Sequence, residues 1–154
     1  MEVQQTDDIV VKGMSTMHEI REMVAEDYPS LIELWNRTEG LAISEADSEE
    51  AIDYYLRRNP GMSFVCIDEN RIIGTVMCGH DGRRGYLYHV AVDQDFRGRK
   101  LAQELVKRSL SRLSEEGIHR CHILVIADNE IGKHFWTKTG WNRRDGILLY
   151  SHET

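Results

Sequence analysis

The sequence predicts an α/β protein of the α+β type, in which a mostly antiparallel sheet and amphipathic helices share one core. Short runs rich in β-branched residues follow one another in the middle of the chain, and helical patterns lie on both sides of them. A content of 41% hydrophobic and 29% charged residues is typical of a globular protein. The 154 residues suit one domain. We therefore expect a single domain over 17–154, preceded by a loosely ordered extension over 1–16 that shows no periodicity.

The first elements of this domain are a strand and two helices. Weak alternation predicts a strand over 18–24. Apolar side chains at helical spacing predict a helix over 26–37, with Pro29 in the first turn, where a missing N–H does no harm. A second, shorter helix is expected to begin at Ser48 and to end before the Asn-Pro-Gly break at 59–61.

The middle of the chain predicts three consecutive antiparallel strands. Two β-branched runs, 63–67 and 71–78, are separated by a short polar turn and indicate a hairpin. A glycine-rich turn over 79–85 then returns the chain into a strand over 86–92.

The second half of the domain alternates helices and strands. Leucines at helical spacing predict the main helix from Leu101 to Gly117. A short apolar strand is expected over 122–127, a last helix over 130–139 and a final strand over 147–150.

The junction between the strand at 86–92 and the main helix has the composition of an anion-binding loop. The first turn of a helix offers unpaired N–H groups and a partial positive charge, which suit a pyrophosphate. Gly98 allows close approach of the backbone, small Ala102 keeps the first turn uncrowded, and Arg97, Arg99 and Lys100 add charge. A solvated basic loop that only begins a helix fits the same residues. Neither a Walker loop nor the Gly-x-Gly-x-x-Gly fingerprint of dinucleotide-binding proteins is present.

The stretch Arg97-Gly98-Arg99-Lys100-Leu101-Ala102, after Val90-Ala91-Val92, resembles the cofactor loop of the GNAT superfamily of acyl-CoA N-acyltransferases. The resemblance is to small single-domain bacterial members and covers about 17–150. Several further motifs match in the expected order: Ile73-Gly74-Thr75-Val76, Asn129, His134-Phe135-Trp136 and Gly140-Trp141. Dispersed motifs in order are far more specific than the loop alone.

The resemblance implies a mixed, mostly antiparallel central sheet that is splayed between two parallel strands, 86–92 and 122–127, and is flanked by about four helices. It also implies acetyl-CoA as co-substrate, with the acetyl group transferred to a primary amine by direct attack in a ternary complex. The residues that the resemblance assigns to acetyl-CoA binding are Val90, Ala91, Val92, Arg97, Gly98, Arg99, Lys100, Leu101, Ala102, Asn129 and Trp136. Asn129 also fits the role of a helix cap before Glu130.

The chain departs from the family pattern at two positions. Lys100 stands where the family usually has glycine, and Trp136 stands where many members have a tyrosine that protonates the departing thiolate. These departures motivate an alternative function, that of a catalytically weak CoA-binding regulatory or interaction module with the same fold.

Amine attack requires a base or a water relay, because an amine with a pKa near about 10.4 must first lose a proton. We expect Tyr88 or His89 in this role, with His80 and Asp81 as further candidates; each of the four also fits a structural role. Strict alternation would place Tyr88 and His89 on opposite faces of the sheet. An acidic segment near the expected acceptor site either attracts a cationic amine or only solvates and caps the second helix; its acids are Glu39, Glu45, Asp47, Glu49 and Glu50.

Composition restricts the partners and the compartment. A net charge of −7 disfavours nucleic acid, and no apolar run approaches the length of a membrane span. The three cysteines lack the spacing of a zinc site or a disulfide framework, so no metal site is predicted. We expect a cytoplasmic protein that acts on a small-molecule or peptide amine and, as family members often do, forms a homodimer.

Overall fold

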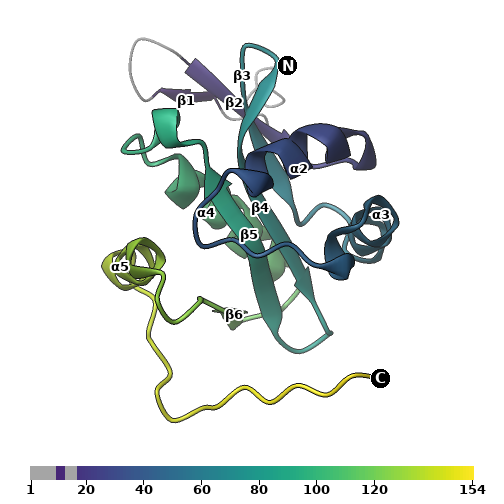
Figure 1. The fold of residues 1–154 in the computed structure, drawn as a ribbon, viewed down its shortest axis with the longest axis vertical. Coiled ribbons are helices and arrows are strands. Elements are labelled where there is room, and N and C mark those ends of the chain that lie inside the picture. The colour runs from purple at the N-terminus through teal and green to yellow at the C-terminus, as the bar shows by residue number, and fades with distance from the viewer. Residues whose placement is uncertain (1–9, 13–16) are drawn as a thin grey trace. The chain divides into compact units, whose positions relative to one another are not determined.

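Within the residues that the computed structural model describes, 10–12 and 17–154, six strands form one sheet (Figure 1). The strands are, in order, β1 (Val10–Lys12), β2 (Met17–Glu22), β3 (Phe64–Asp68), β4 (Arg71–His80), β5 (Gly85–Val92) and β6 (Cys121–Ile123). Neighbouring strands are antiparallel from β1 to β5, whereas β5 and β6 are parallel. The predicted mixed and mostly antiparallel sheet is confirmed.

Helices cover both faces of this sheet. The helices α2 (Tyr28–Asn36) and α3 (Glu49–Arg58) lie on one face and α4 (Leu101–Glu115) on the other (Figure 1). Two neighbouring residues of β4 show the division. Thr75 accepts a hydrogen bond from Trp35 of α2, whereas a Cβ atom at Gly74 would lie 3.1 Å from Leu105 of α4. Successive strand residues point to opposite faces, so the sheet is the middle of three layers.

Local sequence signals set the bounds of these helices. Pro29 lies in the first turn of α2, and the Ser48 hydroxyl caps α3 by accepting the Ala51 N–H at 3.1 Å. A 3-10 turn, η2 (Glu45–Asp47), directly precedes that cap. Apolar side chains of α4 recur on one face and are buried, among them Leu101, Leu105 and Leu113.

The core beneath α2 is built around Trp35, whose side chain has no exposed surface. It packs with residues from both helices and from β3, β4 and β5. The buried members of this cluster are Met23, Leu31, Leu34, Trp35, Ile52, Val65, Ile72, Met77 and Ala91.

The chain divides into two compact units, one ending at Leu124 and the other running from Val125 to Thr154. The second unit contains α5 (Glu130–Lys138), which begins at an Asn129 cap. Within it Trp136 is buried against Phe135 and Trp141, with ring centroids 4.9 and 4.7 Å away. The expected single domain over 17–154 stays a prediction. Most of the expected extension over 1–16 lies outside the described residues, although Val10–Lys12 form β1.

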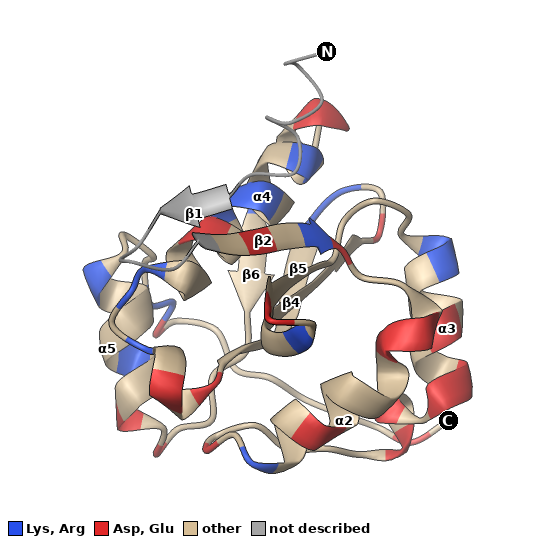
Figure 2. Ribbon diagram, turned by 90° about the horizontal axis from the view of Figure 1, so that it is seen from above, with Lys and Arg blue, Asp and Glu red and all other residues tan. Residues whose placement is uncertain are grey.

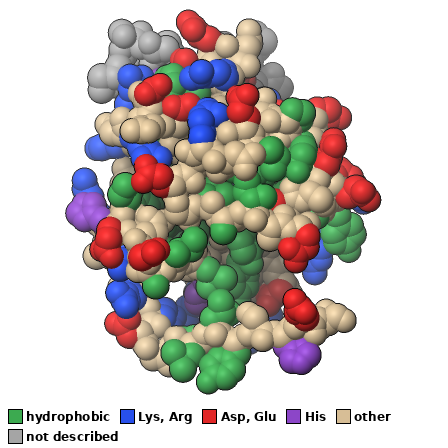
Figure 3. All heavy atoms as spheres, in the orientation of Figure 1, with side chains coloured by type: hydrophobic (Ala, Val, Ile, Leu, Met, Phe, Trp, Pro, Cys, Tyr) green, Lys and Arg blue, Asp and Glu red, His purple; other side chains and the backbone are tan. Residues whose placement is uncertain are grey.

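Two predicted strands are corrected. The apolar segment Ile147–Tyr150 is not a strand, and its side chains are 67–86% exposed. In the space-filling view, hydrophobic side chains lie at the surface along the C-terminal stretch (Figure 3). Within the described part of its unit no other strand is available, and a strand without a partner leaves its backbone groups without a ladder. The strand expected over 122–127 is shorter and ends at Ile123.

No helix within the described part of the chain is long and apolar enough to cross a membrane.

Candidate functional site

The loop between β5 and α4 presents a row of backbone N–H groups without partners. Among the described residues, no acceptor is bonded to the N–H groups from Gly98 to Gln103, and the first N–H of this turn that is used belongs to Glu104, which donates to the Lys100 carbonyl at 3.1 Å. Gly98 has φ +79°, and a Cβ atom built there would meet nothing within 4 Å. The loop therefore offers an open cradle of donors at a helix N-terminus, which is the geometry that binds phosphate groups.

Two basic side chains next to this cradle are held by different contacts. The Arg97 guanidinium turns back and donates from Nε to the Val92 carbonyl at 3.1 Å, which fixes the start of the loop to the end of β5. Arg99 lies over the ring of Phe96, with its guanidinium carbon 5.2 Å from the centroid. Both contacts hold positive charge beside the free N–H groups, which suits a polyanionic ligand.

Lys100 occupies a backbone conformation that favours glycine. It is the N-cap residue of α4 with φ 63° and ψ 21°, and its side chain makes no capping hydrogen bond. A residue with a Cβ atom pays about 1–2 kcal/mol in this left-handed region. The position therefore requires the conformation for which glycine is suited, and the chain adopts it with lysine at an energetic cost.

Lys100→Gly is expected to stabilise the protein by about 0.5–1 kcal/mol, because the relief of left-handed strain exceeds the extra entropy that glycine loses on folding. Urea unfolding measures this change in free energy. Lys107→Gly is the matched control, since Lys107 is exposed in the interior of the same helix and its replacement should destabilise by about 1 kcal/mol. A loss of stability in both variants would contradict the assignment of strain to Lys100.

Asp93 anchors the entry to the loop. Its carboxylate lies 2.7 Å from Arg37 and 3.8 Å from Arg71, and it accepts the Asp95 N–H at 2.9 Å. Burial would raise the pKa of the Asp93 carboxyl, but the hydrogen bonds from Arg37 and Asp95 and the charges of both arginines outweigh it and hold the pKa below its usual value. These residues line a polar cavity of about 310 Å³ that also reaches Arg97. The ion pairs thus fix the point at which the loop leaves the sheet.

A β-bulge interrupts β5 near its middle. Thr75 pairs with Ala91 and Met77 pairs with Tyr88, so His89 and Val90 together face the single residue between them on β4. His89 has φ 48°, a value rare for a residue other than glycine. The bulge breaks the alternation expected from the sequence. Tyr88, His89 and Ala91 all face α2 and α3: Tyr88 contacts Tyr55, His89 contacts Trp35, and Ala91 belongs to the core around Trp35.

Beyond the bulge, the outer edge of β5 is not paired with β6. Their parallel pairing covers Gly85–Leu87 and Cys121–Ile123 and goes no further. Asp93 donates its N–H to Ile73 of β4 at 2.7 Å, and alternation therefore turns the backbone groups of Val92 away from β4. The second half of β5 therefore has no paired strand on this edge among the described residues, as a splayed sheet requires.

His89 and Tyr88 occupy different environments at the bulge. The His89 imidazole is largely buried and its Nε2 lies 2.7 Å from Asp47 Oδ1. Tyr88 is 40% exposed, and its ring meets Tyr55 edge-on at 6.3 Å. Partial burial and the neighbouring Tyr86 raise the pKa of the Tyr88 hydroxyl, which makes its ionised form less accessible. Of the two predicted base candidates, His89 has the contact with an acid that a base requires for orientation.

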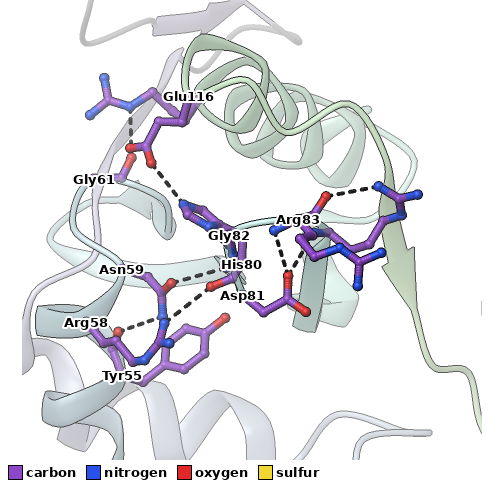
Figure 4. A network of polar contacts seen from close by, with 11 residues as sticks. Tyr55, Arg58, Asn59, Gly61, His80, Asp81, Gly82, Arg83 and Glu116 are labelled. Atoms are coloured by element: carbon purple, nitrogen blue, oxygen red, sulfur yellow. Dashed lines mark hydrogen bonds and ion pairs between the residues drawn. The ribbon is translucent and has the colours of Figure 1, made fainter.

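His80 and Asp81, the other base candidates, are committed to the turn between β4 and β5 (Figure 4). His80 Nε2 lies 2.9 Å from Glu116, and its Nδ1 accepts the Gly82 N–H at 3.0 Å. Asp81 accepts the N–H groups of Arg83 and Arg84 at 2.8 and 2.9 Å, and these hydrogen bonds lower the pKa of its carboxyl. Both residues therefore have the structural role of turn residues.

The acidic segment before and within α3 separates into two kinds of residue. Glu39, Glu45, Glu49 and Glu50 are exposed, and acidic residues gather along α3 in Figure 2. Asp47 is buried at 7% exposure and holds His89. The carboxylate at the site is thus one of the five that the sequence singled out, in a role that the sequence did not indicate.

Comparison with known sequences identifies the family of this chain. The sequence profile described as the acetyltransferase (GNAT) family matches residues 17–141. This chain belongs to the GNAT acetyltransferase family. An acetyltransferase of Pectobacterium atrosepticum is 34% identical over 131 residues, which are 85% of this chain and 92% of the relative.

Solved acetyltransferase structures share the fold. The PaiA N-acetyltransferase of Thermoplasma acidophilum, in complex with coenzyme A, superposes with a TM-score of 0.76 at 19% identity, over 84% of this chain and 92% of that one. A predicted acetyltransferase of Clostridium acetobutylicum with acetyl-CoA gives a TM-score of 0.68 at 18% identity, over 88% and 96% of the two chains. The predicted α/β fold of the GNAT type is confirmed.

The remaining two predicted cofactor residues lie in the second unit of this GNAT chain. The Asn129 side chain accepts the Gly132 N–H at 3.0 Å, so it caps α5. Trp136 packs in the aromatic cluster of its own unit. The first unit brings together the predicted residues from Val90 to Ala102 along one strand and loop. Contact of all these residues with acetyl-CoA stays a prediction.

Sequence reasoning missed the contacts of three residues that shape the site: Trp35, Thr75 and Asp47. Trp35 Nε1 donates to Thr75 Oγ1 at 3.0 Å, and that hydroxyl donates to the His89 carbonyl at 2.8 Å. The residues come from three different elements, and no local pattern connects them. A buried tryptophan in a helix signals only a core position.

Proposed function

We propose that the chain transfers the acetyl group of acetyl-CoA to a primary amine of a small molecule or peptide. The observation that carries this proposal is the row of N–H groups from Gly98 to Gln103 that have no partner among the described residues, together with Arg97, Arg99 and Lys100, in a chain of the GNAT family. Donors and positive charge of this kind match the pyrophosphate of CoA. The outward-turned backbone of Val92, at the end of β5, is suited to pair with the amide groups of a pantetheine arm.

The reaction requires no protein nucleophile. Acetyl-CoA supplies an activated thioester, and the amine nitrogen attacks its carbonyl carbon directly. The departing CoA thiol has a broadly cysteine-like pKa of about 8.5, so its thiolate needs less help from an acid than an alkoxide would. A tryptophan at position 136 in place of the family's tyrosine is therefore compatible with turnover.

The cysteines are expected to remain unmodified during turnover. Burial raises the pKa of Cys66 and Cys78 to about 12 and that of Cys121 to about 11, which keeps all three as weakly nucleophilic thiols at neutral pH. Native protein treated with iodoacetamide at pH 8 should be alkylated far more slowly than urea-unfolded protein, as mass spectrometry would show. An acetylated cysteine trapped during turnover and competent to pass its acetyl group on would contradict direct attack.

Calorimetric titration with acetyl-CoA tests the proposal at its first step, with ATP and NAD as controls. Saturable and selective binding at micromolar concentration is the expected result. Amines are then screened for CoA release above the rate of acetyl-CoA hydrolysis. Absence of binding would overturn the proposal, whereas binding without acetyl transfer to any amine would favour the alternative, a CoA-binding regulatory or interaction module.

A further inference from the structure

The His89 imidazole is fixed at one nitrogen and open at the other. Its Nε2 lies 2.7 Å from Asp47 Oδ1, while no donor or acceptor of the described chain is bonded to Nδ1. The side chain keeps 14% of its surface exposed, so the ring is not sealed in the core. A histidine in this state has one nitrogen oriented by a carboxylate and one nitrogen free to take a proton.

The backbone beneath this ring is held in a costly conformation. A φ of 48° at a residue other than glycine costs on the order of 1–3 kcal/mol and persists only when surrounding structure enforces it. Here the His89 carbonyl accepts the Thr75 hydroxyl at 2.8 Å, and Thr75 in turn accepts the Trp35 indole N–H at 3.0 Å. The same indole lies 4.5 Å from the imidazole, centroid to centroid. The sheet and α2 therefore set where the ring lies.

Asp47 is oriented just as firmly. Its Oδ2 accepts the Ser44 N–H at 3.0 Å, and its backbone carbonyl accepts the Tyr28 hydroxyl at 2.7 Å. These contacts leave Oδ1 for His89. The Asp47 carboxylate is thus oriented so that its Oδ1 accepts a hydrogen bond from His89 Nε2.

The charges around the pair are few. The Tyr28 hydroxyl of α2 donates to the Asp47 backbone carbonyl at 2.7 Å, and Tyr88 precedes His89 along β5. Within the described residues, no Lys or Arg forms an ion pair with Asp47; its ion-pair partner is His89. Asp47 is therefore the charged group in direct contact with the His89 ring.

We propose that Asp47 is a positioning residue that keeps the proton of neutral His89 on Nε2, so that Nδ1 acts as the base of the acetyl transfer. This inference rests on the proposed function. The acceptor ammonium group gives one proton to Nδ1, and its freed lone pair forms the bond to the thioester carbonyl carbon. The carbon–sulfur bond breaks, and CoA leaves as the thiolate with the bonding electrons. The thiolate takes the second proton of the amine nitrogen, and the imidazolium returns its proton to water.

The pair formed by His80 and Glu116 is a natural control within the same chain. It is also a histidine beside a carboxylate, 2.9 Å apart, but His80 Nδ1 already accepts the Gly82 N–H. No lone pair is left on that ring for a substrate proton. If the contact between Asp47 and His89 were only structural, substitutions in it should affect the reaction as little as substitutions in the pair of His80 and Glu116.

Asp47→Asn tests the positioning role without any substrate. The Ser44 N–H needs an acceptor, so the amide oxygen of Asn is expected to turn toward it and the amide NH2 toward His89. Because an NH2 group only donates, Nε2 would have to accept and the proton would move to Nδ1. Imidazole ¹⁵N NMR at neutral pH should show the Nε2–H form of His89 in the wild type and the Nδ1–H form in the variant, with His80 unchanged. The same His89 tautomer in both proteins would overturn the inference.

Kinetics with an amine accepted by the wild type test the catalytic consequence. Asp47→Asn and His89→Gln should each lower kcat/KM about 100-fold with acetyl-CoA affinity unchanged, and the remaining rate should rise steadily with pH across the neutral range, because only the unprotonated fraction of the amine can then react. The double variant should be no slower than the single ones, because the two residues act as a unit. Glu116→Gln and His80→Gln should leave both the rate and its pH profile as in the wild type.

The outcomes separate this inference from the proposed function. An active Asp47→Asn enzyme with the wild-type pH profile would overturn the positioning role and leave acetyl transfer standing. A wild type that acetylates no amine would overturn the proposed function and, with it, the role of His89 as base. The NMR comparison would then still decide whether Asp47 sets the His89 tautomer.

Discussion

Replacement of Gly98 by proline is expected to weaken acetyl-CoA binding by about 100-fold while changing the melting temperature little. Proline removes one N–H of the cradle and cannot adopt the φ of +79° that Gly98 has, since its ring holds φ near −65°. Lost hydrogen bonds to a charged ligand are worth about 1.5–3 kcal/mol, and every 1.4 kcal/mol is a tenfold change in affinity. Gly98 lies in open space on a loop, so the core should not be affected. Calorimetry and thermal unfolding measure the two quantities.

Two matched variants show whether the N–H group or the strain is responsible. Gly98→Ala retains the N–H and adds a Cβ atom that meets nothing within 4 Å, so its loss of affinity should be much smaller. Gly82→Pro places the same change at another exposed glycine of positive φ, +94°, in the turn after β4, and should leave acetyl-CoA binding intact. Wild-type affinity in Gly98→Pro would count against the whole assignment of the loop.

Trp35→Ala is expected to lower the free energy of unfolding by about 3–5 kcal/mol, the usual cost of removing a large aromatic side chain from a core. The Trp35 side chain has no exposed surface and contacts the core between α2, α3 and the sheet. Its loss also leaves Thr75 Oγ1 without the indole N–H donor beneath the bulge of β5. Urea unfolding followed by circular dichroism at 222 nm measures the change without depending on tryptophan fluorescence.

The controls for this prediction separate burial from hydrogen bonding. Trp35→Phe retains an aromatic ring but removes the N–H, so it should cost less than Trp35→Ala. Tyr54→Ala removes an aromatic side chain that is 61% exposed on α3 and should stay within about 0.5 kcal/mol of the wild type. A loss below about 1 kcal/mol in Trp35→Ala would show that the space under α2 is filled in another way.

The elements predicted with local signals were found close to where the sequence placed them. The helical spacing of leucines, a Ser cap and a Pro or Gly at helix ends are properties of short stretches, and they located α2, α3, α4 and α5. The basic loop before α4 could likewise be predicted, because its glycine and its charged residues lie in one contiguous motif. The family followed from several such motifs in order.

The predictions that failed depended on partners distant in the chain. The apolar segment 147–150 has the composition of a strand, but a strand requires a neighbour to pair with, and its own unit provides none among the described residues. The alternation of β5 was misread because a bulge at His89 adds one residue to the strand. Glycine in the left-handed region is a usual sequence signal of a bulge, but here that conformation belongs to a histidine, so the sequence did not indicate the bulge.

The sequence by itself determined most of the helices and strands, the antiparallel succession of β3, β4 and β5, and the basic loop before α4, since each depends on residues a few positions apart. Only the tertiary structure decided which side chains meet at the bulge. Asp47 and His89 are 42 positions apart, and Trp35 is 40 positions from Thr75. Such contacts arise when α2 and η2 pack on the sheet, and packing depends on the shape of the whole core rather than on any local pattern.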